Sequence, residues 1–223
     1  MKTAGLFVTG TDTDIGKSLV AAGLTRMLVN RGVSVGVFKP VASGGPISED
    51  GKLLQKAAKK PDSAYDQIVP LHYKQPLAPY VAGWKEGKVD LAKVEEAYER
   101  AKASCDFLIV EGVGGALVPI SKGFYVADWI KKWNMPTLVV VGAGLGTINH
   151  TLLTVEALQR RKIKVMGVLV NSYRGKTAAE RTNVRALKKL LKVPIYGPLI
   201  RNPRYQKDLD LLARDLEELG LKF

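Results

Sequence analysis

The segment Gly10-Thr11-Asp12-Thr13-Asp14-Ile15-Gly16-Lys17-Ser18 is the most informative stretch of this sequence. It follows an apolar run at 4–9 that is typical of a buried strand, and it precedes 19–31, which has helical periodicity. A glycine-containing turn between a strand and a helix directs backbone N–H groups at one point, which suits a polyphosphate. The segment therefore predicts a phosphate-binding loop in which Lys17 reaches the outer phosphates and the Ser18 hydroxyl is a ligand for Mg²⁺.

The spacing of the two glycines departs from the common P-loop pattern. Five residues separate Gly10 from Gly16, whereas the common pattern has four. Because of this one inserted residue, the segment does not match the strict P-loop motif. The alternative interpretation is a tight strand–helix turn that binds no ligand.

The composition is ordinary for a globular protein, with 46% hydrophobic and 25% charged residues in a chain of 223. No uninterrupted apolar stretch approaches the roughly 20 residues that span a bilayer. The first residues lack a signal-peptide pattern, and a single cysteine, Cys105, fits a reducing compartment. We therefore expect a cytoplasmic protein with no membrane partner.

The formal net charge of +13 raises the question of a nucleic-acid partner. Basic residues cluster at 160–164 and, at helical spacing, at Arg185, Lys188, Lys189 and Lys192. Neither cluster has interleaved aromatic residues or a recognised binding module. We expect a solvated basic surface that attracts anionic substrates, and no nucleic-acid binding.

Apolar runs alternate with helical patterns along the chain, which predicts an α/β fold: a P-loop NTPase-like, mainly parallel sheet with helices on both faces. We expect strands at 4–9, 33–39, 107–111, 137–141 and 164–171, with a weaker one near Ile195. We expect helices at 18–31, 91–103, 126–133, 148–161, 178–191 and 207–219. The stretch 61–87 is rich in proline and tyrosine and has no clear period, so we expect an excursion over the strand ends. Nothing divides the chain, and 1–223 are predicted to form one domain.

Four further segments fall at strand ends on the same edge of the predicted sheet. Lys39 leaves a strand just before Pro40, which restricts its conformations and holds its ammonium in place. Glu111 begins Glu-Gly-Val-Gly-Gly, and its carboxylate is placed for Mg²⁺ while the glycines let backbone approach phosphates. The turn at 142–150 offers a second helix N-terminus, suited to a carboxylate, with a flexible turn as the alternative. Asn171 follows a strand, where asparagine more often forms a turn than contacts a nucleobase edge.

The predicted Mg²⁺ site needs oxygen ligands with only one or two carboxylates. Ser18 and Glu111 supply two ligands. Asp50 is the strongest further candidate, with Asp12 and Asp14 as alternatives that spacing does not separate. The only histidines, His72 and His150, form no cluster with cysteine, so a zinc site is not expected.

Taken together, these segments resemble the dethiobiotin synthetase family. The resemblance covers nearly the whole chain and rests on the loop at 10–18, Lys-Pro-Val-Ala-Ser-Gly at 39–44, Glu-Gly-Val-Gly-Gly at 111–115, Ala-Asp-Trp at 127–129, and Leu-Gly-Thr-Ile-Asn-His-Thr-Leu-Leu-Thr at 145–154. The extra loop residue is this family's own form. The resemblance implies an ATP-dependent ligase of biotin biosynthesis, which converts 7,8-diaminononanoate and CO₂ to dethiobiotin, ADP and phosphate through a carbamate and a carbamic–phosphoric anhydride.

The resemblance also implies residue roles. Lys17 and Lys39 would be catalytic, and Ser18, Asp50 and Glu111 would hold Mg²⁺, which favours Asp50 over its competitors. ATP would be bound by Asp14, Ile15, Gly16, Lys17, Ser18, Leu19, Asp50, Glu111, Gly112, Val113, Gly114, Asn171, Ser172, Ile200, Arg201 and Asn202. The substrate would be bound by Thr13 and Ser43, and its carboxylate by Gly146, Thr147, Ile148 and Asn149 of a partner subunit, in a homodimer with shared active sites.

One segment departs from the family pattern. Family members often carry an Ile-Pro pair after a strand-end glycine near the base, whereas here Gly197 is followed by Pro-Leu-Ile-Arg-Asn-Pro. Selectivity for the purine is therefore not implied by this segment.

Three other functions compete with the ligase interpretation. A ligase like the cobyrinic acid amidation synthetases would need a glutaminase domain, for which 223 residues leave no room. A nucleotide switch of the ParA/MinD type usually carries a lysine early in its loop, where this chain has Asp12, Thr13 and Asp14. A catalytically silent nucleotide-binding module would not need both Lys17 and Lys39.

Overall fold

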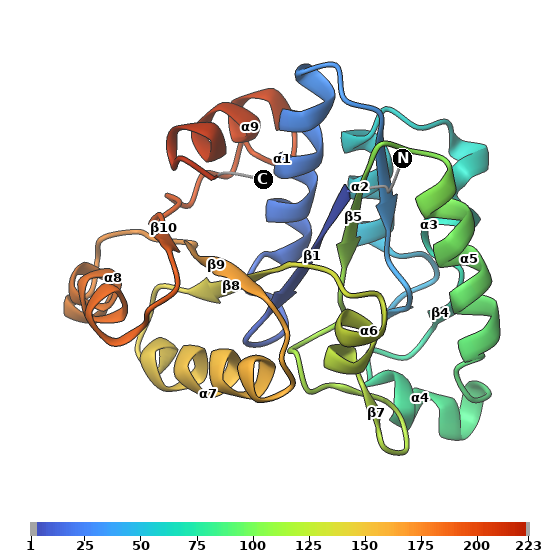
Figure 1. Cartoon of the computed structure of the whole chain (residues 1–223). Coiled ribbons are helices and arrows are strands. Elements are labelled where there is room, and N and C mark those ends of the chain that lie inside the picture. Colours follow the sequence, from blue (N-terminus) through green and yellow to red (C-terminus); the bar gives the residue numbers. More distant parts are fainter. Residues whose placement is uncertain (1–3, 222–223) are drawn as a thin grey trace.

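The computed structural model describes residues 4–221 and is built on a six-stranded sheet (Figure 1). All neighbouring strands of this sheet are parallel. Their spatial order is β10 (Ile195–Tyr196), β9 (Val165–Asn171), β8 (Thr137–Gly142), β1 (Ala4–Gly10), β5 (Phe107–Glu111) and β2 (Val35–Phe38). Because β1 lies between β8 and β5, the loop that follows it emerges at the middle of the sheet edge. The predicted α/β class and parallel sheet are confirmed.

One face of the sheet is covered by α1 (Lys17–Asn30), α2 (Glu49–Ala57) and α9 (Leu209–Glu218). Alternate residues of β1 point to opposite faces, as expected for a strand buried on both sides. Leu6 and Val8 belong to the core under α1, whereas Phe7 belongs to the core on the other face.

The opposite face is covered by α5 (Leu91–Ala103), α6 (Val126–Lys132), α7 (Thr147–Arg160) and α8 (Ala178–Leu190). Aromatic rings fill part of this core. The ring of Trp133 stacks on Tyr98, with centroids 4.1 Å apart, and on Trp129, with centroids 5.6 Å apart. Helices on both faces are therefore confirmed.

The first and last helices of the domain approach each other closely (Figure 1). Gly23 of α1 permits this contact, because a Cβ atom at this position would lie 2.5 Å from the side chain of Leu216 and 2.7 Å from that of Leu212. Both leucines are fully buried on α9. The helix that begins with Lys17 is thus held by the C-terminal part of the chain.

The stretch 61–87 is more ordered than its sequence predicts. It contains the 3₁₀-helix η1 (Asp62–Ala64), α3 (Tyr65–Ile68), β4 (His72–Tyr73) and α4 (Pro79–Glu86). Strand β4 pairs with β3 (Ala42–Ser43) in a small parallel sheet. These elements are too short to show a period, and Pro79 occupies the first position of α4, where its missing N–H costs nothing.

Helix α2 is also absent from the prediction, although its N-terminus carries a recognisable cap. The Ser48 hydroxyl accepts a hydrogen bond from the Gly51 N–H at 3.1 Å, and Glu49 and Asp50 occupy the first turn. Elsewhere the predicted elements agree with the structure to within about two residues. The last helix begins at Leu209 rather than 207 because the Asp208 carboxylate caps it by accepting from the Leu211 N–H.

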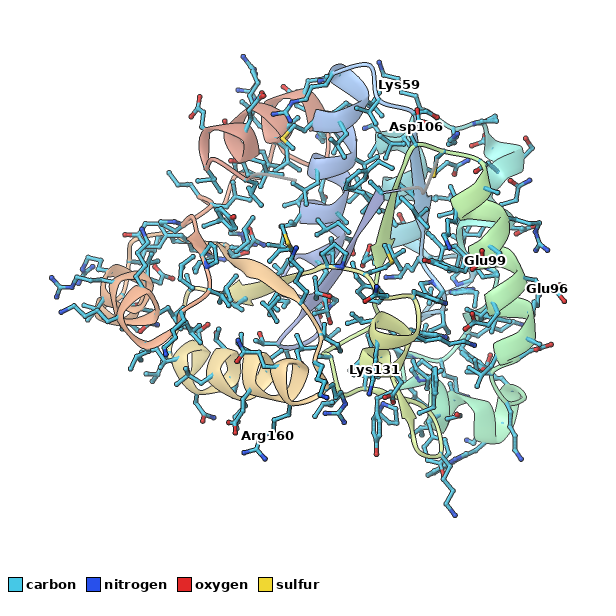
Figure 2. All side chains as sticks on the ribbon, in the orientation of Figure 1. Lys59, Glu96, Glu99, Asp106, Lys131 and Arg160 are labelled. Atoms are coloured by element: carbon cyan, nitrogen blue, oxygen red, sulfur yellow. The ribbon has the colours of Figure 1, made fainter. Side chains whose placement is uncertain are left out.

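A second small sheet pairs β6 (Pro119–Ser121) with β7 (Phe124–Tyr125) and is antiparallel. Glu96 on α5 and Arg160 on α7 are exposed charged side chains on the outside of the molecule (Figure 2). Across residues 4–221, the structure has no helix with the length and apolar character needed to cross a bilayer.

Candidate active site

A cleft of about 820 Å³ opens at the carboxyl ends of β1, β2 and β5. This is the edge at which open α/β sheets bind their ligands. The cleft brings together many of the predicted site residues, namely Thr13, Asp14, Gly16, Lys17, Ser18, Leu19, Lys39, Ser43, Asp50, Glu111, Val113 and Gly114. Ile15 and Gly112 adjoin these residues in sequence but do not line the cleft.

The loop after β1 has the backbone geometry of an anion-binding turn. Asp14 and Gly16 both lie in the left-handed region, with φ of 56° and 90°. No side chain caps the start of α1, so the first N–H groups of the helix point at the loop without a side-chain acceptor. The Lys17 ammonium folds back over the loop and donates to the Asp12 carbonyl at 2.7 Å.

Lys39 lies at the centre of a buried charge cluster. Its Nζ is 2.7 Å from Oε1 of Glu111 and 2.9 Å from Oδ2 of Asp50. The Ser18 hydroxyl donates to the same Glu111 oxygen at 2.7 Å. Lys39 and Glu111 are 2% and 0% exposed. The residue before Pro40 is thus held in place, as the sequence predicts.

Lys17 and Lys39, two of the lysines that line the cleft, have opposite pKa shifts. Burial lowers the pKa of Lys17, and the nearby Lys39 adds to this effect, although the carboxylates of Glu111, Asp50 and Asp12 oppose it. Burial also acts to lower the pKa of Lys39, but the adjacent carboxylates of Glu111 and Asp50 outweigh it and raise the pKa. Lys39 is therefore held as an ammonium ion, and Lys17 is the easier of the two to deprotonate.

The two carboxylates also differ. Burial raises the pKa of Glu111, and the attraction of Lys39 only partly offsets this effect. Burial acts in the same direction on Asp50, but the attraction of Lys39 and the nearby Ser18 hydroxyl outweigh it, so the pKa of Asp50 is lowered. Asp50 is the more persistently ionised acid of the pair.

The residues present fit a magnesium ion. Oε2 of Glu111 is buried and has no hydrogen-bond partner among residues 4–221, which leaves one oxygen of a fully buried carboxylate unused. The Ser18 hydroxyl and the Asp50 carboxylate lie beside it, and this donor set of oxygens with two carboxylates is the kind Mg²⁺ prefers. The part of the chain that the structure describes holds no group of three His, Cys, Asp or Glu side chains suited to a metal.

The residues expected beside the base gather at the end of β9. Asn171 is the last residue of that strand, and Tyr173 forms a bridge with Ile200. The Arg201 N–H donates to the Tyr173 carbonyl at 2.9 Å, which holds the segment of Arg201 and Asn202 beside Ser172. None of the five predicted residues lines the cleft, namely Asn171, Ser172, Ile200, Arg201 and Asn202.

The second predicted anion site, at Gly146, Thr147, Ile148 and Asn149, forms the start of α7 after β8. Gly146 has φ of 91° and precedes the helix, and the Thr147 hydroxyl donates to the Gly142 carbonyl at 2.6 Å. This turn does not line the cleft of the same chain. The neighbouring Leu145 is 95% exposed.

The other end of the cleft has an apolar wall. Pro76, Leu77 and Ala78 line the cleft together with Val118. The Glu86 carboxylate fixes the start of this wall by accepting hydrogen bonds from the N–H groups of Lys74 at 2.8 Å and Gln75 at 3.1 Å. Residues 76–78 of the stretch 61–87 therefore lie at the strand ends, as predicted, whereas α3 packs beside the edge strand β2 and α5.

Sequence reasoning missed several cleft residues. These are Glu49, Lys52, Leu53 and Lys56 of α2, the wall at 76–78, Val118 and Gln206. The Ser48 cap and the acidic pair after it could have indicated α2 and so its cleft-facing side chains. No local pattern marks Gln206.

The fold and the loop define a P-loop nucleotide-binding protein. A family model described as "AAA domain" matches residues 4–207. Among solved structures, the chain is similar to a ParA family ATPase from Chlorobium tepidum (TM-score 0.58, 14% identity, 100% of this chain and 94% of that one). It is also similar to the MinD cell division protein of Aquifex aeolicus (TM-score 0.54, 17% identity, 96% and 87%). At these identities the likeness concerns the fold alone.

The chain belongs to the ATP-dependent dethiobiotin synthetase family. It is 40% identical to the ATP-dependent dethiobiotin synthetase of Endomicrobium trichonymphae over 197 residues, which covers 86% of this chain and 90% of the relative. It is 39% identical to that of Thermodesulfovibrio yellowstonii over 221 residues, with 92% of each chain covered. The Aquifex aeolicus synthetase is 37% identical over 207 residues, with 92% and 93% covered.

Proposed function

We propose that this protein is an ATP-dependent ligase of biotin biosynthesis that converts 7,8-diaminononanoate and CO₂ to dethiobiotin. Family membership over most of the chain supports the activity. The observation that carries the proposal within the structure is the ammonium of Lys39, held between Glu111 and Asp50 in the same cleft as the Lys17 loop. The proposal treats the whole chain as one ligase domain.

The reaction has three steps. One amine of the substrate adds to CO₂ and loses a proton, which gives a carbamate. A carbamate oxygen attacks the γ-phosphorus of ATP, and ADP leaves as the carbamic–phosphoric anhydride forms. The second amine then attacks the carbonyl carbon, closes the five-membered ring and expels phosphate, with loss of its proton.

The two lysines suit the phosphoryl-transfer step. A carbamate and a triphosphate are both anions, and their approach is opposed by charge repulsion. Lys17 and Lys39 place two ammonium groups on one cleft, where they can offset this repulsion and stabilise the transferring phosphoryl group. Burial strengthens this electrostatic contribution because it excludes water.

Magnesium is part of the proposal, with Ser18, Asp50 and Glu111 as the residues that would hold it. When bound, Mg²⁺ neutralises phosphate charge and orients the triphosphate. Thr13 and Ser43 would contact the diamine and carbamate. Asn171, Ser172 and the segment 200–202 would contact the base, which they can reach from the end of β9.

A homodimer is a further part of the proposal. The turn from Gly146 to Asn149 lies outside the cleft of its own chain, and it would bind the substrate carboxylate in the site of a partner subunit. Exposed Leu145 and Leu153, at 95% and 57%, support an interface around α7. A cytoplasmic location is proposed because the sequence contains a single cysteine.

The test is a reconstitution with omissions. Purified protein is incubated with 7,8-diaminononanoate, bicarbonate, ATP and Mg²⁺, and product mass and ADP release are measured while each component is left out in turn. The proposal requires a product with the mass of dethiobiotin and ADP release that depends on the diamine. ADP release that is indifferent to the diamine would instead indicate a nucleotide switch of the ParA/MinD type.

A further inference from the structure

The short helix α3 is hydrogen-bonded to the backbone on both sides of the ion pair between Lys39 and Asp50. At its end, the Ile68 carbonyl accepts a hydrogen bond from the Lys39 N–H at 2.8 Å. At its start, the Tyr65 hydroxyl accepts one from the N–H of Ser48 at 2.8 Å, two residues before Asp50. One element therefore sets where both partners of the ion pair lie.

Tyr65 contacts the start of α2 with its ring as well as its hydroxyl. Ser48 is 5% exposed, so little water can reach its N–H if the hydroxyl is removed. The ring packs against Gly51 in the first turn of α2, since a Cβ atom at Gly51 would lie 3.0 Å from the ring and 2.5 Å from the Val69 side chain. Tyr65 therefore holds the turn that carries Asp50.

The direction of the Asp50 carboxylate depends on this turn. The Asp50 side chain is 47% exposed, whereas that of Lys39 is 3% exposed. Burial keeps the Lys39 side chain in place, but the half-exposed side chain of Asp50 has room to turn away. Its distance of 2.9 Å from the Lys39 ammonium is therefore sensitive to the position of its own backbone.

We propose that Tyr65 is a positioning residue, which keeps Asp50 directed at Lys39 and at the proposed magnesium site. The inference rests on the proposed function in taking Asp50 as a ligand of Mg²⁺. Tyr65 does not line the cleft, so it acts through α2 and not by contact with a ligand. Its loss should weaken the contribution of Mg²⁺ to nucleotide binding and leave the Lys17 loop intact.

The experiment compares Tyr65→Phe with the wild type, because this change removes the hydroxyl and keeps the ring. Titration calorimetry measures the affinity for the non-hydrolysable analogue AMPPNP, once in excess Mg²⁺ and once in EDTA. Loss of one buried hydrogen bond should lower the affinity in Mg²⁺ about three- to tenfold and change the affinity in EDTA by less than about twofold.

Three results would overturn the proposal. The first is an unchanged affinity of Tyr65→Phe in Mg²⁺. The second is an equal loss in Mg²⁺ and in EDTA, which would indicate general destabilisation. The third is a wild-type affinity that is the same with and without Mg²⁺, because Asp50 would then hold no metal beside the nucleotide.

Tyr73 provides a matched control. It is 6% exposed, and its hydroxyl donates a hydrogen bond to the Gly87 carbonyl at 2.7 Å, beyond the end of α4. Tyr73→Phe loses a hydrogen bond of similar length but leaves the start of α2 untouched, so both affinities should stay within about twofold of the wild type. A selective loss in Mg²⁺ of the same size as in Tyr65→Phe would contradict the assignment.

A second variant, Gly51→Ala, tests the same contact without changing the hydroxyl. Alanine favours the helix more than glycine does, but its methyl group would press on Tyr65 and Val69 and displace α2 from α3. The affinity in Mg²⁺ should fall here too, and an unchanged value would refute the proposal. If these affinities behave as expected but the wild type makes no dethiobiotin, the ligase proposal fails and the positioning of Asp50 stands.

Discussion

The ammonium of Lys39 lies 2.7 Å from the carboxylate of Glu111, and both side chains are buried at the floor of the cleft. A buried ion pair is tolerated only when each charge keeps its partner, because an unpaired charge in this environment is strongly destabilising. Lys39 also contacts Asp50 at 2.9 Å, so the positive charge is shared by two acids. In the proposed function, stability and catalysis therefore depend on the same atoms.

The Lys39→Ala variant should separate nucleotide binding from turnover. Loss of a preorganised cation typically raises the barrier by about 3–4 kcal/mol, so turnover should fall by a factor of roughly a hundred or more. Affinity for ATP should be retained because Lys17 and the loop are unchanged. Steady-state kinetics and nucleotide titration measure the two effects. Lys131→Ala, an exposed lysine on α6, is the control, and near-normal turnover of Lys39→Ala would reject the role.

The Glu111→Gln variant should reduce the apparent affinity for Mg²⁺. The substitution removes the carboxylate whose Oε2 has no hydrogen-bond partner within 4–221, while an amide oxygen can still accept from Ser18. Altering one group in the surroundings of a metal typically costs about 10- to 100-fold in affinity or activity. The measurement is activity as a function of Mg²⁺ concentration. Glu99→Gln on the outside of α5 is the control, and an unchanged Mg²⁺ requirement in Glu111→Gln would contradict the assignment.

The lowered pKa of Lys17 predicts that kcat/KM for ATP falls at alkaline pH. As the pH rises through this lowered value, Lys17 loses its charge and kcat/KM for ATP should fall, at a pH below the 10.5 of an ordinary lysine. The raised pKa of Lys39 keeps that residue charged throughout. Within this window the folded state binds fewer protons at Lys17 than the unfolded chain, so this residue alone makes unfolding free energy rise with pH.

The measurement is a pH profile of kcat/KM for ATP in wild type and in Lys17→Arg. A guanidinium stays charged across the range, so its profile should lose the alkaline limb even though its overall activity is lower. A limb that persists in Lys17→Arg would assign the titration to another group.

The Glu86→Ala variant should change the KM for the diamine rather than the KM for ATP. Glu86 fixes the N–H groups of Lys74 and Gln75, directly before the apolar wall at 76–78. Releasing this segment should raise KM for the diamine by roughly three- to tenfold while the KM for ATP stays unchanged. Glu96→Ala, an exposed residue of α5, is the control. A rise in the KM for ATP of similar size would show that the segment acts on the whole cleft.

Much of the fold and the phosphate loop could be predicted from sequence because each depends on local patterns. The apolar runs are short and buried on both faces. The loop that ends in Gly16, Lys17 and Ser18 comes directly after the first of these runs. Glu111 could be placed for the same reason, since it ends a clearly apolar strand. Parallel strands then bring their carboxyl ends to one edge without further information.

The position of Asp50 could not be derived from spacing. It depends on α2, a helix of nine residues with glycine in its first turn, which weakens its helical pattern. The hydrogen bond between Asn171 and Ile15 could not be predicted from the sequence either, because it joins the end of one strand to a loop far away in sequence. Such contacts follow from the order of the strands in the sheet, in which only β8 separates β9 from β1, and no local propensity encodes that order.

The close approach at Gly23 has a consequence for how this protein tolerates change. Any side chain at position 23 would push against Leu212 and Leu216 of α9 and tilt α1, the helix that follows the phosphate loop. Mutational scanning should therefore find a sensitive site at Gly23, away from the cleft. Truncations or fusions that disturb α9 should change nucleotide affinity, although no residue of α9 lines the cleft.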